Sequence, residues 1–173
     1  MRSVSTASQV KRVASRDLGI VDGLVQLSFC VQAIVGGVTS RYDSSISQTR
    51  LLGALRGREL TMAQIARLLN LDKSSATGLV DRAASKGYVV RSASRQDGRS
   101  VRVSLTAQGR RVTERVAHEV AQQIDAVARG MSSAERRRLS QLASKFVVLD
   151  ADRRGIDLQA GREATTPGKP GAA

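Results

Sequence analysis

The chain has very few of the residues on which disulfide, zinc and acid–base chemistry depend. It contains one cysteine, Cys30, and one histidine, His118, in 173 residues. A lone cysteine excludes an internal disulfide framework and is typical of a reducing compartment, which favours a cytoplasmic protein. The two residues are too few for a typical structural zinc site, and they provide no nucleophile–histidine–carboxylate set. With no phosphate-binding glycine loop either, we expect no metal, no cofactor and no enzymatic activity.

Aromatic residues and long apolar runs are also scarce. Tryptophan is absent, and the only aromatic residues are Phe29, Tyr42, Tyr88 and Phe146, so a ligand pocket built by aromatic stacking would be sparse. No uninterrupted apolar run reaches the length of a membrane span. The basic N-terminus is not followed by the apolar core of a signal peptide. We therefore expect no secretion and no membrane partner.

Positive charge, in contrast, is abundant. Lys and Arg number 28 against 15 Asp and Glu, which gives a formal net charge of +13 and a pI near 11.4. Such a surplus favours a polyanionic partner, either nucleic acid or an acidic membrane surface. Arginine outnumbers lysine 23 to 5, and its forked guanidinium group suits contacts to phosphates and bases.

The middle of the chain carries the start and stop signals of two short, closely joined helices. Thr61 followed by Gln64 forms a capping box, and Ile65 begins an apolar stripe at helical spacing. Asn70 tolerates the left-handed conformation that ends a helix, and Asp72 is a natural N-cap for the next one. The pattern predicts a helix-turn-helix.

The second of these helices has an exposed face of small hydroxyl and basic side chains. Such a face suits a helix that enters a major groove, where Ser, Thr and Arg can reach base edges or phosphates. The alternative is an ordinary solvated helix face. The candidate DNA-contacting residues are Lys73, Ser74, Ser75, Thr77, Gly78 and Arg82.

A basic β-hairpin is expected directly after this helix pair. Residues 88–90 form a β-prone run, residues 101–105 alternate apolar and polar side chains, and Asp97-Gly98 is a hairpin-turn signal. Following a helix-turn-helix, such a ribbon predicts a winged helix, whose tip can insert arginine into the minor groove. The alternative is a charged hairpin kept soluble by its arginines, which are Arg91, Arg95, Arg99 and Arg102.

Residues 46–111 resemble the DNA-binding domain of the MarR (multiple-antibiotic-resistance regulator) family. Asp97-x-Arg99, then Leu105-Thr106, is similar to the family's wing signature, and residues 87–91 are similar to its first wing strand. The resemblance implies that Asp97 and Arg99 belong to the support or tip of the wing, with Arg95 a further tip candidate. Which arginine touches DNA stays open.

The flanking segments predict long helices with broad apolar stripes. The stripe over residues 17–40 exceeds what one small winged domain needs, so part of it is expected to meet a partner subunit. In the family, the terminal helices form the dimer. We therefore expect a mainly α fold with a small β-hairpin wing. A basic flexible arm (1–16) should precede a winged-helix domain (17–150), and a disordered tail (151–173) should follow it. Within the domain, the DNA-binding lobe is expected at about 46–111 and the dimerisation helices at about 17–40 and 106–149.

Together these features predict a homodimeric, sequence-specific transcriptional regulator, a repressor of a pseudo-palindromic double-stranded DNA operator. The resemblance implies release by a small-molecule effector, for which Arg41 and Tyr42 are the candidate anchors. Two alternatives stay open: a winged module that binds protein or DNA without sequence choice, and a thiol-based redox sensor acting through Cys30. Cys30 can equally be a small buried apolar residue.

Overall fold

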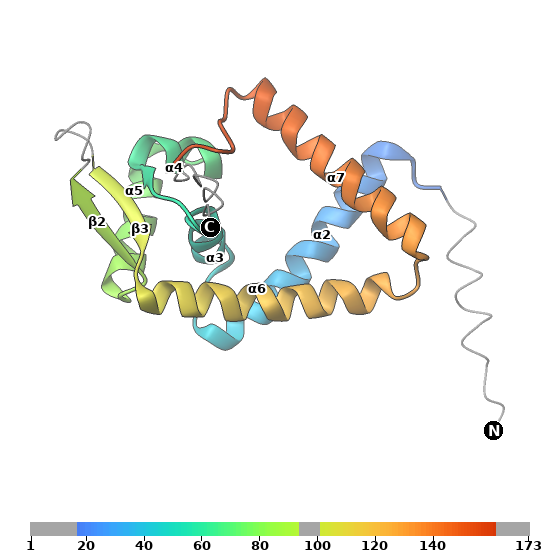
Figure 1. The fold of residues 1–173 in the computed structure, drawn as a ribbon, viewed down its shortest axis with the longest axis horizontal. Coiled ribbons are helices and arrows are strands. Elements are labelled where there is room, and N and C mark those ends of the chain that lie inside the picture. Colours follow the sequence, from blue (N-terminus) through green and yellow to red (C-terminus); the bar gives the residue numbers. More distant parts are fainter. Residues whose placement is uncertain (1–16, 94–100, 162–173) are drawn as a thin grey trace, which may run out of the picture. The chain divides into compact units, whose positions relative to one another are not determined.

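The computed structural model describes residues 17–93 and 101–161 of the chain (Figure 1). The N-terminal arm (1–16), the tip of the hairpin (94–100) and residues 162–173 lie outside the described residues. The elements are, in chain order, α2 (Gly19–Thr39), the 3-10 helix η1 (Ser40–Tyr42), α3 (Ile46–Ala54), β1 (Leu60–Thr61), α4 (Met62–Leu69), α5 (Lys73–Ser85), β2 (Val89–Ala93), β3 (Val101–Leu105), α6 (Ala107–Ala128) and α7 (Ser133–Arg153).

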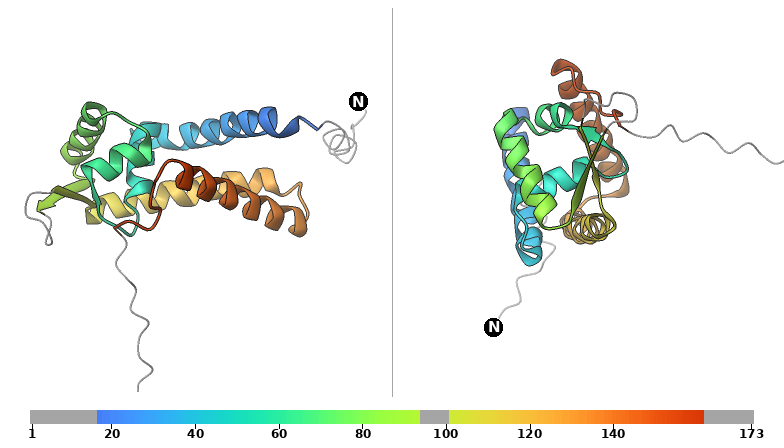
Figure 2. Two further views of the ribbon diagram at one scale, coloured as in Figure 1. Left: turned by 90° about the horizontal axis from the view of Figure 1, so that it is seen from above. Right: turned by 90° about the vertical axis from the view of Figure 1, so that its left-hand side faces the viewer.

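The chain divides into two compact units. The terminal-helix unit comprises Met1–Ile46 and Val116–Ala143, and the winged-helix unit comprises Ser47–Arg115 and Ser144–Ala173. The long helices α6 and α7 contribute residues to both units. In the winged-helix unit, α3, α4 and α5 gather beside the sheet (Figure 2).

The predicted helix-turn-helix is confirmed in its local details. The Thr61 side chain accepts a hydrogen bond from the Gln64 amide at 3.3 Å, and the Gln64 side chain accepts one from the Thr61 amide at 2.8 Å. Asn70 ends α4 with φ +56°, and the Asp72 side chain caps α5. Gly87, at φ +69°, follows α5 in the left-handed conformation that glycine adopts at little cost.

The sheet has one more strand than the predicted hairpin. β2 and β3 pair antiparallel with Val89 opposite Leu105, and the short strand β1 pairs with the other side of β3, with Leu60 opposite Val103. The expected alternation on β3 buries Val103 and Leu105 but leaves Val101 44% exposed. Only the half of β3 nearest α6 therefore faces the core.

One hydrophobic cluster holds the winged-helix unit together. It is built from the inner faces of α3, α4 and α5 and from the sheet, as the apolar spacing of those segments predicts. Its buried members are Leu51, Leu52, Leu55, Leu60, Ile65, Leu69, Leu79, Val80, Ala83, Val89, Val103 and Leu105.

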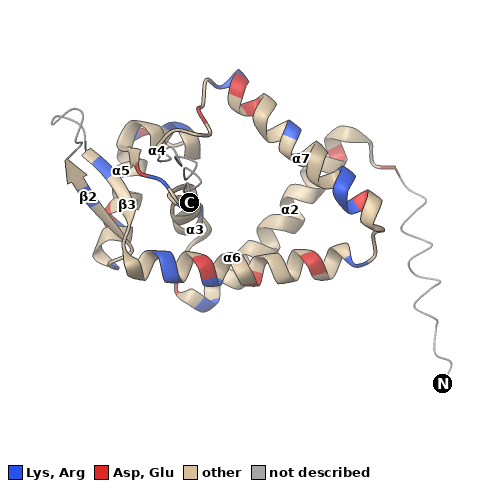
Figure 3. Ribbon diagram, viewed as in Figure 1, with Lys and Arg blue, Asp and Glu red and all other residues tan. Residues whose placement is uncertain are grey.

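Among the described residues, much of the apolar surface of the terminal helices is exposed, although Val38 at the end of α2 is buried. Leu139, Leu142, Phe146 and Leu149 on α7 have the spacing of inward residues, but they are 41–57% exposed. Their role as part of the dimer interface stays a prediction. Helix α2 is likewise apolar and exposed, with Ile20 at 77%, and almost none of it is charged (Figure 3).

The expectation that no segment is apolar enough for a membrane span also needs correction. Gly19–Tyr42 contains a window of mean hydropathy 1.6, none of it buried, so it passes as a candidate span by length and composition. Its glycines and serines interrupt the apolar run, but the mean hydropathy of the window stays high. The same length and composition fit a helix that is buried against another protein surface.

The chain after Asp150 differs from the predicted disordered tail. Helix α7 continues to Arg153, and Ala151 is buried. Within the winged-helix unit, residues 154–161 hydrogen-bond through Arg154, Leu158 and Gly161 to the segment 58–67. The apolar alternation of this segment is short, with only Ile156, Leu158 and Ala160 as its half-buried apolar side chains, and backbone and arginine contacts hold the rest of it.

Candidate nucleic-acid interface

Helix α5 presents the exposed polar face that the sequence predicts. Its buried stripe of Ala76, Leu79, Val80 and Ala83 faces the core, which turns the opposite side to solvent. Lys73, Ser74, Ser75, Thr77 and Arg82 are exposed there, and Gly78 is half-buried. All six candidate residues on this helix therefore share one accessible surface.

Asp72 organises the first turn of α5. Its carboxylate accepts hydrogen bonds from the Ser74 hydroxyl at 2.6 Å, the Ser75 hydroxyl at 2.6 Å and the Ser75 amide at 2.8 Å. The hydroxyls of Ser74 and then Ser75, followed by the Ser75 amide, hold the pKa of the Asp72 carboxyl well below its usual range. With their protons donated to Asp72, both hydroxyls keep their oxygen lone pairs available as acceptors for base amino groups.

Further along α5, the hydroxyl and guanidinium groups take different roles. The Thr77 hydroxyl donates to the Lys73 carbonyl at 2.8 Å, one turn back on the same helix. A side chain on Gly78 would lie 3.3 Å from Arg82 Nη1. Gly78 therefore leaves room for the Arg82 guanidinium to lie along the exposed face.

The first strand of the wing is joined to α5 by an ion pair. Arg91 Nη1 on β2 lies 2.6 Å from Asp81 Oδ1 on α5, and both side chains are partly solvent-exposed. The remaining wing candidates, Arg95, Asp97 and Arg99, lie outside the described residues. Their assignment to the support or tip of the wing stays a prediction.

The start of α6 is anchored at the end of α5 and the base of the wing. The Thr106 hydroxyl donates to the Gly87 carbonyl at 2.6 Å and accepts from the Gly109 amide at 2.9 Å, so Thr106 caps α6. A side chain at Gly109 would fall 1.9 Å from the Tyr88 carbonyl oxygen. The helix can approach the wing this closely only because residue 109 has no side chain.

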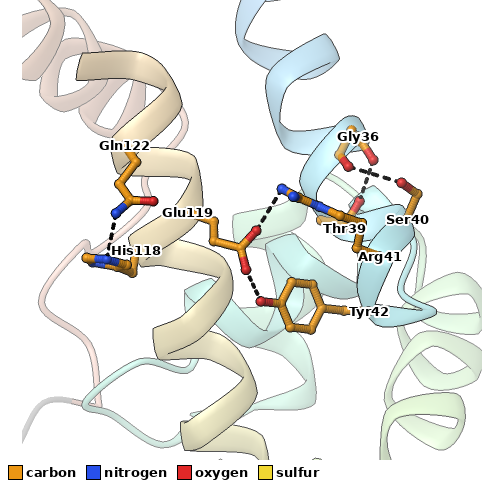
Figure 4. Close-up of polar contacts among 9 residues, drawn as sticks. Gly36, Thr39, Ser40, Arg41, Tyr42, His118, Glu119 and Gln122 are labelled. Atoms are coloured by element: carbon orange, nitrogen blue, oxygen red, sulfur yellow. Dashed lines mark hydrogen bonds and ion pairs between the residues drawn. The ribbon is translucent and has the colours of Figure 1, made fainter. Parts of the chain in front are cut away.

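The two candidate effector anchors lie together in the terminal-helix unit (Figure 4). Arg41 and Tyr42 are on η1, and both bind Glu119 on α6: Arg41 Nη2 is 2.7 Å from Oε2, and the Tyr42 hydroxyl donates to Oε1. The two carboxylate oxygens of Glu119 therefore bind the Arg41 guanidinium and the Tyr42 hydroxyl.

Cys30 lies on α2 and is exposed, so the interpretation of Cys30 as a buried apolar residue does not hold within the single chain. Its role in redox sensing stays a hypothesis.

Two groups in the candidate sites were missed by the sequence analysis, and a third was only partly assigned. Asp81 and Glu119 each bind an arginine from another element, and no local signal marks such pairs. Asp72 was assigned only as a helix cap, although serines two and three residues after an aspartate are a readable sign of the hydroxyl arrangement.

Comparison with known proteins finds relatives that resemble part of the chain. The model of the MarR family matches residues 42–100. YfiV, an uncharacterized HTH-type transcriptional regulator of Bacillus subtilis, is 36% identical over 73 residues, which are 42% of this chain and 46% of that protein. The match thus spans about half of the relative's length.

Solved structures share the fold over a larger part of the chain. Wild-type MarR of E. coli in its apo form superposes with a TM-score of 0.65 at 22% identity, covering 76% of this chain and 98% of that one. NadR in complex with 4-hydroxyphenylacetate superposes with a TM-score of 0.64 at 25% identity, covering 76% and 94%. Residues 42–100 thus resemble the MarR family, and the capped helix pair and the wing strands belong to a fold that the chain shares with these solved structures.

Proposed function

We propose that this chain is a homodimeric repressor that binds a pseudo-palindromic operator and is released by a small organic acid, in the cytoplasm. The observation that carries the proposal is the exposed face of α5, where Lys73, Arg82 and the Asp72-bound serines lie together. In a helix-turn-helix, this is the helix that reads the major groove. The net charge of +13 supports a polyanionic partner.

The uncovered apolar faces of α2 and α7 support the dimer. One winged module buries only about 600–1,000 Å² on DNA, a modest interface. A second copy would double it and place two recognition helices about 34 Å apart, one turn of the duplex. Covering exposed side chains such as Ile20 and Phe146 would provide the hydrophobic driving force for association.

The operator proposal is tested with duplexes from the region upstream of the chain's own gene. In a gel-shift assay at physiological salt, the wild-type chain should prefer one such duplex over random sequence by about 10³-fold or more. The substitution Arg82→Ala should weaken that binding without changing the Tm of the chain. An affinity ratio near one would instead favour the alternative of a non-specific DNA-binding module.

The dimer proposal is tested by sedimentation equilibrium at micromolar concentration. Phe146→Glu should shift the chain from dimer to monomer, because it places a charge on the apolar face of α7. Gln141→Glu adds the same charge on the same helix without removing an apolar side chain, and it should stay dimeric. A monomeric wild-type chain would contradict the proposal, and so would its partition into phosphatidylcholine vesicles through α2.

The arrangement around Glu119 supports an anionic effector. Arg41 and Tyr42 already bind one carboxylate, so a ligand carboxylate can exchange for Glu119 with no new type of contact. A guanidinium and a phenol also suit an acid that carries a hydroxyl group. NadR, a structural neighbour, is described in complex with such an acid, 4-hydroxyphenylacetate.

Calorimetric titration with 4-hydroxyphenylacetate tests this exchange. Glu119→Gln should bind the acid more tightly than wild type, because the competing internal carboxylate is gone. Arg41→Ala should abolish binding. Equal affinities for all three chains would rule out this site, and unchanged DNA binding in saturating acid would rule out release by this compound.

A further inference from the structure

The segment that follows α7 belongs to the winged-helix unit and docks there on α4 and on the residues between α3 and β1. We name Arg154–Gly161 the C-terminal strap; in Figure 1 it returns beside α4. Arg154 Nη2 donates to the Arg67 carbonyl at 2.8 Å. The Leu158 carbonyl accepts from Arg58 Nη1 at 2.8 Å, and the Gly161 carbonyl accepts from the Glu59 amide at 3.0 Å.

The contact at Gly161 is tight enough to require glycine. Gly161 has φ +73°, and a side chain there would lie 1.8 Å from the Glu59 carbonyl oxygen and 3.3 Å from Leu60 Cδ2. A Cβ atom cannot approach a backbone oxygen so closely. The end of the strap and the residue ahead of β1 are therefore packed backbone against backbone.

The strap also has an inner and an outer side. Arg154, Ile156, Leu158 and Ala160 are half-buried, whereas the residues between them are exposed. Ala160 packs against the hydrophobic cluster of the winged-helix unit. A cavity of about 140 Å³ remains beneath the strap, lined in part by Gln64, Leu68 and Ile156.

These contacts hold the β1–α4 segment at both of its ends. Glu59, just ahead of β1, is fixed by Gly161, and Arg67, in the last turn of α4, is fixed by Arg154. Helix α4 is the first helix of the helix-turn-helix, and its inner residues share one core with those of α5. Movement of α4 would therefore displace α5.

We propose that the C-terminal strap is a positioning element for DNA recognition: it fastens the end of α7 to α4 and to the residue before β1, and full operator affinity requires the docked strap. The proposal rests on the proposed function, since it concerns the same recognition helix. It assigns a role to residues beyond those that the family model matches.

Two pairs of substitutions in the full-length chain test the strap. Gly161→Ala introduces the clash with Glu59, whereas Gly155→Ala substitutes a glycine of similar backbone conformation, φ +61°, with nothing within 4 Å of the new side chain. Arg154→Met removes the bond to Arg67, whereas Arg153→Met removes an adjacent arginine that is 77% exposed and pairs with Asp150. Gly155→Ala thus imposes a similar backbone strain, and Arg153→Met the same loss of charge, but neither control disturbs a contact between the strap and residues 58–67.

Two readouts follow each chain: hydrogen exchange of the Glu59 amide and gel-shift affinity for the operator duplex. Gly161→Ala and Arg154→Met should each speed Glu59 exchange and weaken operator binding by about five- to tenfold, the effect of losing roughly one hydrogen bond. The controls should stay within about twofold of wild type. If Gly161→Ala does not fold, Arg154→Met alone still tests the proposal.

Wild-type exchange at Glu59 in both test variants would overturn the docked strap. Faster exchange with control-level operator affinity would overturn its role in positioning α5. If the wild-type chain prefers no duplex, the proposed function fails; the exchange result then still decides, independently, whether the strap is docked.

Discussion

Arg91 on β2 and Asp81 on α5 form an ion pair, with 2.6 Å between Nη1 and Oδ1, that joins the wing to α5. Both groups are exposed enough for solvent to screen the pair, so its contribution to the free energy of unfolding is at most about 1 kcal/mol. Its larger effect concerns DNA. Asp81 puts a negative charge on the helix proposed to enter the groove and occupies an arginine that could otherwise bind phosphate.

Asp81→Asn should therefore strengthen duplex binding without regard to sequence. Freeing Arg91 for one more phosphate contact should steepen the dependence of log K on log salt concentration by about one unit. The preference for operator over random duplex should stay unchanged, because the gain in affinity is the same for both. Fluorescence anisotropy across a salt series measures both quantities.

The matched control for this substitution is Asp125→Asn on α6. It changes the net charge of the chain by the same amount and replaces another exposed carboxylate. If both variants steepen the salt dependence equally, net charge and not the freed Arg91 accounts for the effect.

The sequence predicted best what short-range chemistry decides. The capping box of Thr61 and Gln64, the left-handed Asn70 and the cap at Asp72 each depend on residues within three or four positions, and the structure has all of them. Apolar spacing likewise identified the inner faces of α4 and α5.

The missed features are contacts between distant parts of the chain. Tyr42 and Glu119 are 77 positions apart, and Arg67 and Arg154 are 87 positions apart. β1 was missed because two residues are too few for an alternating pattern to be visible. The stripe on α7 has inward spacing, yet its side chains stay exposed, since periodicity shows that a face is apolar but not which surface covers it.

Acid should destabilise the chain in part through Asp72. Its folded pKa lies below the ordinary value of 3.8 because the Ser74 hydroxyl, then the Ser75 hydroxyl and amide, stabilise the carboxylate. The unfolded chain therefore binds more protons in acid, so this stabilisation is present above about pH 4 and is lost as the pH falls toward the folded pKa. Asp72→Asn keeps a good helix cap but should make the fall in Tm between about pH 5 and about pH 3 shallower.

Asp152→Asn is the control for that experiment, as a matched loss of one exposed carboxylate on α7. Thermal melts monitored by circular dichroism give the slope of Tm against pH for the three chains. A slope for Asp72→Asn as steep as that of wild type would show that the serine hydroxyls do not stabilise the Asp72 carboxylate.

Two helical glycines should respond oppositely to alanine. Gly53 on α3 has nothing within 4 Å of a new side chain, so Gly53→Ala should stabilise the chain by up to about 1 kcal/mol through the lower backbone entropy of alanine. Gly109→Ala should destabilise it by roughly 1–3 kcal/mol or more, because the Tyr88 carbonyl oxygen obstructs the new side chain. Urea unfolding measures both; equal effects would contradict the close approach of α6 to the wing.

Arg82 and Arg99 should differ in how they affect operator binding. Arg82 lies on the exposed face of α5, from which a guanidinium can bond a guanine edge, so Arg82→Ala should cost about 1–3 kcal/mol and relax the preference at one base pair in each half-site. Arg99 lies in the connection between β2 and β3, outside the described residues, and by its similarity to the family's wing signature it should reach the minor groove. Arg99→Ala should therefore weaken binding with little change of major-groove preference, and without unfolding the chain. Binding to a library of operators with single base-pair changes separates the two patterns: a uniform loss for Arg82→Ala would assign it to phosphate, and normal binding by Arg99→Ala would remove the wing from the interface.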